Sequence, residues 1–139
     1  YKDLKDLDEH KVSLKLLRDK IIEIRNSKLP NPKEIGNAGS FFKNPIVEIH
    51  TINKIKIDYD DLVYFEGSEG FKIPAAWLIE KSGWKGYKNE NIGISDKHAL
   101  VLVNYGTKSG EKIKQLSIKI MEDVKNKFGI KLEPEVNII

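Results

Sequence analysis

Two stretches of the chain carry apolar residues at the spacing of an amphipathic helix. The first covers residues 13–27, and its apolar positions are Leu14, Leu17, Ile21 and Ile24. Ser13 is a suitable N-cap, and the prolines that follow the stretch prevent its continuation. The second covers residues 109–128, and its apolar positions are Ile113, Leu116, Ile120 and Val124. Gly129 follows as a natural C′ residue, so both stretches are predicted to be helices.

Shorter stretches have weaker patterns. Residues 74–81 read PAAWLIEK and predict a helix with Pro74 at its first position and Gly83 just past its end. Residues 99–104 read ALVLVN, a continuous apolar run that predicts a strand covered on both faces. A final strand is predicted over residues 130–138.

Residues 46–57 carry two competing patterns. The segment IVEIH at the start alternates like a strand, whereas Ile52, Ile55 and Tyr59 suit a short helix capped by Thr51. Both interpretations are open from the sequence. Together the elements predict an α+β fold, in which helices pack on one face of a small mixed or antiparallel sheet.

Composition limits the function classes. The chain has 139 residues, 40% of them hydrophobic and 32% charged, which is typical of one globular domain. A net charge of +3 is too mild to indicate nucleic-acid or membrane binding. The lack of cysteine excludes disulfides, thiolate-bound zinc and a thiol nucleophile. No apolar run is long enough to span a membrane. Because the sequence starts at Tyr1 without a domain-opening cap or turn, we expect it to be a piece of a longer polypeptide.

Residues 35–45 read IGNAGSFFKNP and follow neither period. They lack the Gly-Lys-Ser/Thr of a P-loop, and Phe42 stands where a nucleophile elbow at Ser40 needs glycine. Residues 36–39 match the minimal Gly-x-x-Gly clamp of an RNA-binding KH module, although that loop joins two helices. The segment is either a glycine-rich turn with a capping serine or a backbone that approaches an anion closely. We expect Phe41 and Phe42 to face inward and anchor Ser40.

The polar side chains around this segment suit a phosphorylated small molecule. Ammonium groups supply charge and amides supply hydrogen bonds, and the candidates are Lys28, Lys33, Lys43, Asn37 and Asn44.

Titratable residues further along the chain are ambiguous. In an extended segment Glu133 and Glu135 would share a face, as a solvated pair or with one carboxylate entering a site. His98 precedes the apolar strand and is either a buried structural histidine or a ligand contact. The histidines share no ligand spacing, so no metal site is predicted.

Several of these motifs, in this order, closely resemble the C-terminal, substrate-binding part of the UDP-N-acetylenolpyruvoylglucosamine reductase family, type I branch. They are Lys28–Pro32, Gly36–Pro45, Ala76–Ile79 with Gly83 and Lys85-Gly86, His98–Asn104 and Leu132–Val136. The resemblance implies an FAD-dependent oxidoreductase of bacterial peptidoglycan synthesis in the cytoplasm. In that reaction NADPH reduces the flavin, and UDP-N-acetylglucosamine enolpyruvate becomes UDP-N-acetylmuramate.

The resemblance also assigns roles to residues of this chain. Ser40 matches the serine that protonates the substrate after hydride transfer, and a positioned hydroxyl suffices because a carbanion is a strong base. Glu135 matches the glutamate thought to stabilise or protonate the enol intermediate.

The remaining implied roles concern binding. Lys28 and Asn44 match residues that hold the substrate diphosphate, His98 matches a polar contact on the phosphate side, and Gly39 gives the backbone room beside the ligand. Arg25 is assigned to the flavin.

The resemblance implies that residues 1–27 are a lead-in and connecting helix from a flavin-binding half, and that residues 28–139 form the substrate-binding domain. We expect that domain to be inactive without the N-terminal FAD-binding domains, which are its partners together with the substrate. The alternatives are a stand-alone nucleotide-sugar binding module without catalysis, and an RNA-binding module using Gly36 to Gly39.

Overall fold

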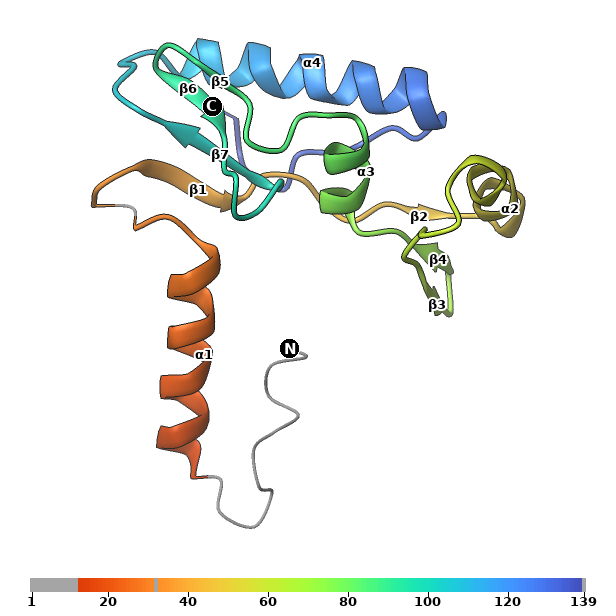
Figure 1. The fold of residues 1–139 in the computed structure, drawn as a ribbon, viewed down its shortest axis with the longest axis horizontal. Coiled ribbons are helices and arrows are strands. Elements are labelled where there is room, and N and C mark those ends of the chain that lie inside the picture. Colours follow the sequence, from red (N-terminus) through yellow and green to blue (C-terminus); the bar gives the residue numbers. More distant parts are fainter. Residues whose placement is uncertain (1–12, 32, 139) are drawn as a thin grey trace.

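The computed structural model describes residues 13–31 and 33–138 and shows an α+β fold (Figure 1). Its helices are α1 (Leu14–Lys28), α2 (Ile49–Asp58), α3 (Ala75–Lys81) and α4 (Gly110–Phe128). One sheet has the order β1-β7-β6-β5, formed by Gly36–Ser40, Val101–Asn104, Ile92–Ile94 and Lys88–Asn89. The other has the order β2-β4-β3, formed by Ile46–Val47, Gly70–Lys72 and Phe65–Gly67. All paired strands are antiparallel.

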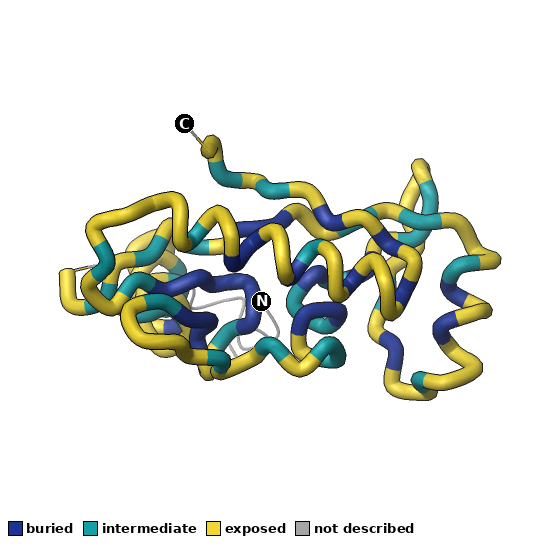
Figure 2. The backbone as a smooth tube through the Cα atoms, turned by 90° about the horizontal axis from the view of Figure 1, so that it is seen from above, coloured by how far each residue is buried: buried dark blue, intermediate teal, exposed yellow. Residues whose placement is uncertain are grey.

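Helix α4 lies along the four-stranded sheet and forms the main core with it (Figures 1 and 2). The predicted stripe faces this core: Leu116, Ile120 and Val124 are buried. Glu111 in the first turn and Lys125 in the last complement the helix dipole. Gly129 ends the helix with φ +69°, so this predicted helix is confirmed together with its C′ glycine.

Strand β7 is the most buried part of the sheet. Leu102 belongs to the core formed with α4, whereas Val101 and Val103, although buried, lie outside that cluster. Side chains alternate across a strand, so these valines point to the other face of the sheet. The prediction of a strand covered on both faces is therefore confirmed.

The three-stranded sheet and α2, residues 46–72, form a side lobe beyond α3 (Figure 1). Both competing patterns in residues 46–57 are realised in succession, as β2 and then α2. The predicted cap is wrong by several residues, because Glu48 rather than Thr51 is the N-cap.

An aromatic cluster attaches the side lobe to the main body. The ring of Tyr59 lies 5.5 Å from the ring of Trp77 and 5.4 Å from that of Phe128, centroid to centroid. Lys81 adds an ion pair of 2.6 Å to Asp61. These contacts join the end of α2 to α3 and to the end of α4, so the lobe is packed against the body.

Helix α1 projects away from both sheets (Figure 1). Its predicted start is confirmed, because the Ser13 side chain accepts a hydrogen bond of 3.1 Å from the Leu16 N–H. The burial of its apolar stripe increases along the helix: Leu14 is 88% exposed, Leu17 and Ile21 are half-buried, and Ile24 is buried.

Three local expectations differ from the structure. Residues 36–40, expected as a turn, form strand β1. Pro74 is the N-cap of α3 rather than its first residue. The predicted strand over residues 130–138 is wrong, because this segment makes one isolated bridge, Pro134 with Phe42. Proline has no N–H to donate, which limits a longer ladder there.

Candidate functional site

Ser40 lies at the end of β1, just past a β-bulge. Asn37 pairs with Val103 and Ser40 pairs with Val101. An advance of three residues along β1 therefore corresponds to two residues along β7. Gly39 within the bulge has φ +72°, a conformation that favours glycine. The Ser40 side chain is on the surface of this edge strand.

The two phenylalanines that follow Ser40 are core residues. Phe41 is 5% exposed and Phe42 is 1% exposed, and their rings meet edge to face with centroids 5.1 Å apart. The prediction that this pair faces inward is confirmed. The exposed serine is therefore adjacent in sequence to a firmly buried anchor.

The backbone of Phe41 connects three segments of the chain. Its N–H donates to Leu100 O at 2.9 Å, and its C=O accepts from the Glu135 N–H at 2.8 Å. Next to it, Lys43 N–H donates to Glu133 O at 2.9 Å. Through these bonds the structure brings the segment of Ser40 beside that of Glu135, although the two residues are 95 positions apart in the sequence. Both glutamate side chains are exposed.

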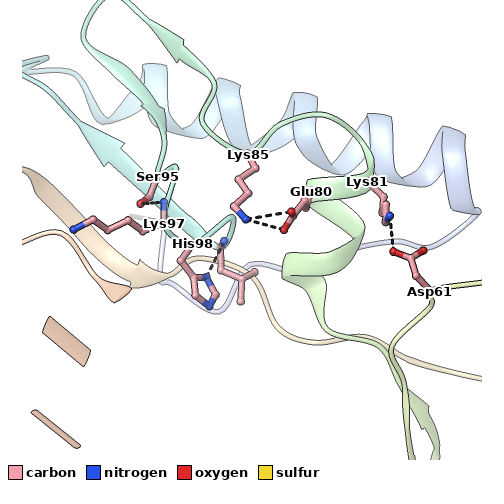
Figure 3. A network of polar contacts seen from close by, with 8 residues as sticks. Asp61, Glu80, Lys81, Lys85, Ser95, Lys97 and His98 are labelled. Atoms are coloured by element: carbon pink, nitrogen blue, oxygen red, sulfur yellow. Dashed lines mark hydrogen bonds and ion pairs between the residues drawn. The ribbon is translucent and has the colours of Figure 1, made fainter. Parts of the chain in front are cut away.

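His98 belongs to the turn before β7, two residues from Leu100. Its Nδ1 accepts a hydrogen bond of 3.3 Å from the Leu100 N–H, which places the proton of the neutral ring on Nε2 (Figure 3). Burial lowers the pKa of His98, and the neighbouring charges of Lys28 and Lys85 lower it further. The neutral imidazole therefore presents an N–H donor beside two ammonium groups.

Lys85 is a member of this basic cluster that received no role in the sequence analysis. It stands after α3 and bonds both carboxylate oxygens of Glu80 at 3.1 Å (Figure 3). The Lys85-Gly86 motif was the sequence signal that could have identified this residue. Sequence spacing alone does not place that motif beside His98.

Asn44 and Gly39 already have partners within the protein. Asn44 Oδ1 accepts a hydrogen bond of 2.8 Å from Ala75 N–H, the first residue of α3. The amide nitrogen of Asn44 is the end that can donate to a ligand. The N–H of Gly39 donates to Asn37 Oδ1 at 3.1 Å. Their roles toward a substrate stay predictions.

Arg25 lies in the last turn of α1, three residues before Lys28. It borders an open cavity of about 490 Å³ whose other lining residues are Asn26, Leu29, Pro30, Asn31 and Asn37. The lining is rich in amide groups, which suit a polar ligand with ring nitrogens or hydroxyl groups. The role of Arg25 toward a flavin stays a prediction.

The described residues form neither a metal-binding cluster nor a membrane-spanning helix. In residues 13–31 and 33–138, no three or more histidine, aspartate or glutamate side chains are grouped so that they could bind a metal ion. No helix within the same residues has the length and apolar character needed to cross a membrane.

Comparison with known proteins gives one consistent family. Residues 31–139 match the family model of the UDP-N-acetylenolpyruvoylglucosamine reductase C-terminal domain. The UDP-N-acetylenolpyruvoylglucosamine reductase of Porphyromonas gingivalis is 45% identical over 143 aligned residues, covering 100% of this chain and 42% of that protein. The reductase of Amoebophilus asiaticus is 46% identical, covering 92% of this chain and 38% of that protein. The reductase of Pseudomonas aeruginosa is 44% identical, covering 85% and 35%.

The chain thus spans about two fifths of the length of the first of these relatives. The matched family model extends over the strand that carries Ser40, the basic turn at His98 and the segment of Glu135. The chain belongs to the UDP-N-acetylenolpyruvoylglucosamine reductase family and corresponds to its C-terminal domain.

Proposed function

We propose that this chain is the substrate-binding and proton-donating part of a reductase that converts UDP-N-acetylglucosamine enolpyruvate to UDP-N-acetylmuramate. The observation that carries the proposal is the convergence on Phe41, whose backbone bonds join the segments of Ser40, Glu135 and His98. The proposal places the reaction in peptidoglycan precursor synthesis, in the bacterial cytoplasm.

The reduction adds a hydride to one carbon of the enolpyruvyl double bond and a proton to the other. The hydride would come from a bound flavin reduced by NADPH. In our proposal the Ser40 hydroxyl delivers the proton, and Glu135 stabilises or protonates the enol on the pyruvyl group. An exposed serine next to a buried anchor suits this role, because its hydroxyl is accessible while its backbone is held.

The diphosphate of the substrate is assigned to the basic cluster. Lys28 and Lys85 supply positive charge, and the neutral His98 ring supplies an N–H donor. Both ammonium groups lower the pKa of His98, which supports this assignment because it groups the three side chains electrostatically.

The flavin is assigned mainly to domains outside this sequence. The residues described here fit a contact with part of it, because the cavity bordered by Arg25 is open and amide-rich. We therefore expect the purified chain to be colourless and to show no NADPH oxidation. A yellow preparation that retains flavin would contradict this part of the proposal.

The catalytic assignment is tested in the complete reductase polypeptide that carries this sequence. Ser40→Ala is expected to lower turnover by about 10²- to 10⁴-fold, the usual contribution of a positioned proton donor, with substrate binding retained. Ser68→Ala, at an exposed serine between β3 and β4, is the matched control and should leave turnover unchanged. Turnover close to the unmodified level in Ser40→Ala would refute the role.

The two carboxylates offer a second matched pair. Glu135→Gln is expected to lower turnover strongly, whereas Glu133→Gln should not. Equal effects of the two substitutions would contradict the assignment of Glu135.

Binding is tested by titrating the UDP-enolpyruvyl sugar and recording NMR shifts and melting temperature. Lys28→Ala should weaken binding. Asn44→Asp should weaken it as well, because it keeps an oxygen for Ala75 N–H but replaces the amide donor with a charge that repels diphosphate. Asn44→Ala is the less informative variant, since it also removes the acceptor at the start of α3.

The same experiments separate the alternative of a stand-alone nucleotide-sugar binding module. Both proposals expect retained affinity in Ser40→Ala, so activity separates them: the binding-module alternative predicts saturable binding by the chain but no reductase activity when the flavin-binding half is added in trans. Restored activity in trans that is lost in Ser40→Ala would exclude it.

A further inference from the structure

The side-chain amide of Asn37 bonds three backbone groups of the protein. Its Oδ1 accepts the hydrogen bond from Gly39 N–H at 3.1 Å. Its Nδ2 donates to Pro30 O at 3.2 Å and to Ile35 O at 3.1 Å. One half-buried amide thus bonds the bulge before Ser40 on one side and the linker after Lys28 on the other.

The bond to Gly39 holds the bulge that sets the direction of Ser40. Val103 and Val101, two residues apart on β7, share a face, so their partners Asn37 and Ser40 share that face too. Without the extra residue, alternation would turn Ser40 to the opposite face, where Leu102 packs toward α4. Glycine is favoured at position 39 by its φ of +72° and not by crowding, since a Cβ there would have no atom within 4 Å.

The bonds from Nδ2 hold the linker that carries Lys28. Pro30 follows Lys28 by two residues, and its carbonyl oxygen accepts from Asn37. Proline restricts the backbone, so fixing its carbonyl limits the directions open to the preceding residues. The electrostatic effect of Lys28 on His98 shows that this end of α1 lies near the basic cluster.

We propose that Asn37 is a positioning residue that couples proton donation to diphosphate binding: its oxygen sets the aim of Ser40, and its nitrogen sets the place of Lys28. This inference rests on the proposed function of Ser40 and Lys28. It assigns separate consequences to the two ends of one side chain, namely kcat to the oxygen and KM for the UDP-sugar to the nitrogen.

The test uses Asn37→Ala and Asn37→Ser in the complete reductase polypeptide. Alanine removes both ends, and we expect kcat to fall and KM to rise by about tenfold each, the equivalent of one lost hydrogen bond of about 1.4 kcal/mol. Serine supplies a hydroxyl oxygen that can accept from the N–H two residues on but cannot reach Pro30. We therefore expect Asn37→Ser to recover most of kcat while KM stays raised.

Asn91→Ser, on the exposed turn between β5 and β6, is the control and should leave both constants unchanged. A merely structural role of Asn37 predicts that kcat and KM recover together or not at all in the serine variant. Either of those results would overturn the proposal.

A second measurement does not depend on the reaction. With glycine-selective ¹⁵N labelling, the Gly39 amide should exchange slowly in the unmodified protein and in Asn37→Ser, and faster in Asn37→Ala. Unchanged exchange in Asn37→Ala would overturn the inference. An unmodified polypeptide without reductase activity, but with this exchange pattern, would instead overturn the proposed function and leave the bond of Asn37 to the bulge established.

Discussion

Helices α4 and α1 have the same signature in the sequence and different surroundings in the fold. Each carries an apolar stripe at helical spacing, and each begins after a serine. Helix α4 buries its stripe against the four-stranded sheet, whereas α1 buries Ile24 and leaves Leu14 exposed. Leu116, Ile120 and Val124 of α4 share one core cluster with Ile94 and Leu102 of the sheet.

The difference separates two meanings of an amphipathic pattern. The pattern predicts that a helix will form with one apolar face, and it does so correctly for both elements. It does not identify what covers that face. For α4 the cover is complete in the described residues, whereas the stripe of α1 is buried only at Ile24 and is half-buried or exposed elsewhere.

The largest expected effect tests this contrast directly. Ile120→Ala removes a fully buried side chain from the α4 stripe and should lower the free energy of unfolding by about 2–5 kcal/mol. Leu14→Ala, at an 88% exposed position of the α1 stripe, should change it by less than about 0.5 kcal/mol. Urea unfolding of both variants gives the comparison. A large loss in Leu14→Ala would show that the α1 face is already packed in solution.

Elements whose ends depend on neighbouring residues were predictable from the sequence, whereas elements that depend on pairing with distant segments were not. The ends of α1 and α4 depend on caps and on neighbouring residues, and the sequence located both within one residue. Strand β1 was missed because its residues GNAGS have low strand propensity, and its pairing with β7 supplies the order. The segment around Pro134 was overpredicted for the converse reason, since its alternation suits a strand but its proline limits pairing.

The candidate site shows the same difference between what local sequence predicts and what depends on long-range contacts. The sequence singled out Ser40 and Glu135 through a family resemblance, but their proximity depends on hydrogen bonds between segments far apart in the chain. Lys85 could not be assigned without the turn that brings it near His98. The partners of Asn37 likewise depend on the fold, because a side-chain amide can bond many different neighbours.

A smaller effect is expected at the helix starts. The Ser13 side chain caps α1, whereas Ser109 at the start of α4 makes no side-chain cap bond. Ser13→Ala should therefore destabilise α1 by about 0.5–2 kcal/mol, and Ser109→Ala should leave α4 nearly unchanged. Because α1 projects from the body, the loss should appear as faster amide exchange in the first turns of α1 rather than in global unfolding. Similar exchange in both variants would mean that the Ser13 bond contributes nothing in solution.

The smallest effect concerns the point where α1 meets the body. The pKa of His98 is lowered from its ordinary value of 6.5, first by burial and then by Lys28 and Lys85. As the pH falls below about 6.5, the unfolded chain therefore binds a proton before the folded chain does. The stabilising contribution of the neutral ring is complete above that pH and is lost as the pH falls toward the lowered pKa. Protonation also ends the bond that Nδ1 accepts from Leu100 N–H.

Removing the charge at the end of α1 should reduce this pH dependence. In Lys28→Met the pKa of His98 should rise toward its ordinary value, because one repelling cation is gone. An NMR titration of the His98 ring measures the shift, and Lys54→Met on α2 is the control with no expected effect. A His98 pKa that does not respond to Lys28→Met would show that the last turn of α1 is not held against the rest of the domain. In that case the contrast between α1 and α4 would extend to the last turn of α1, and Lys28 would need the bound diphosphate to bring it to the site.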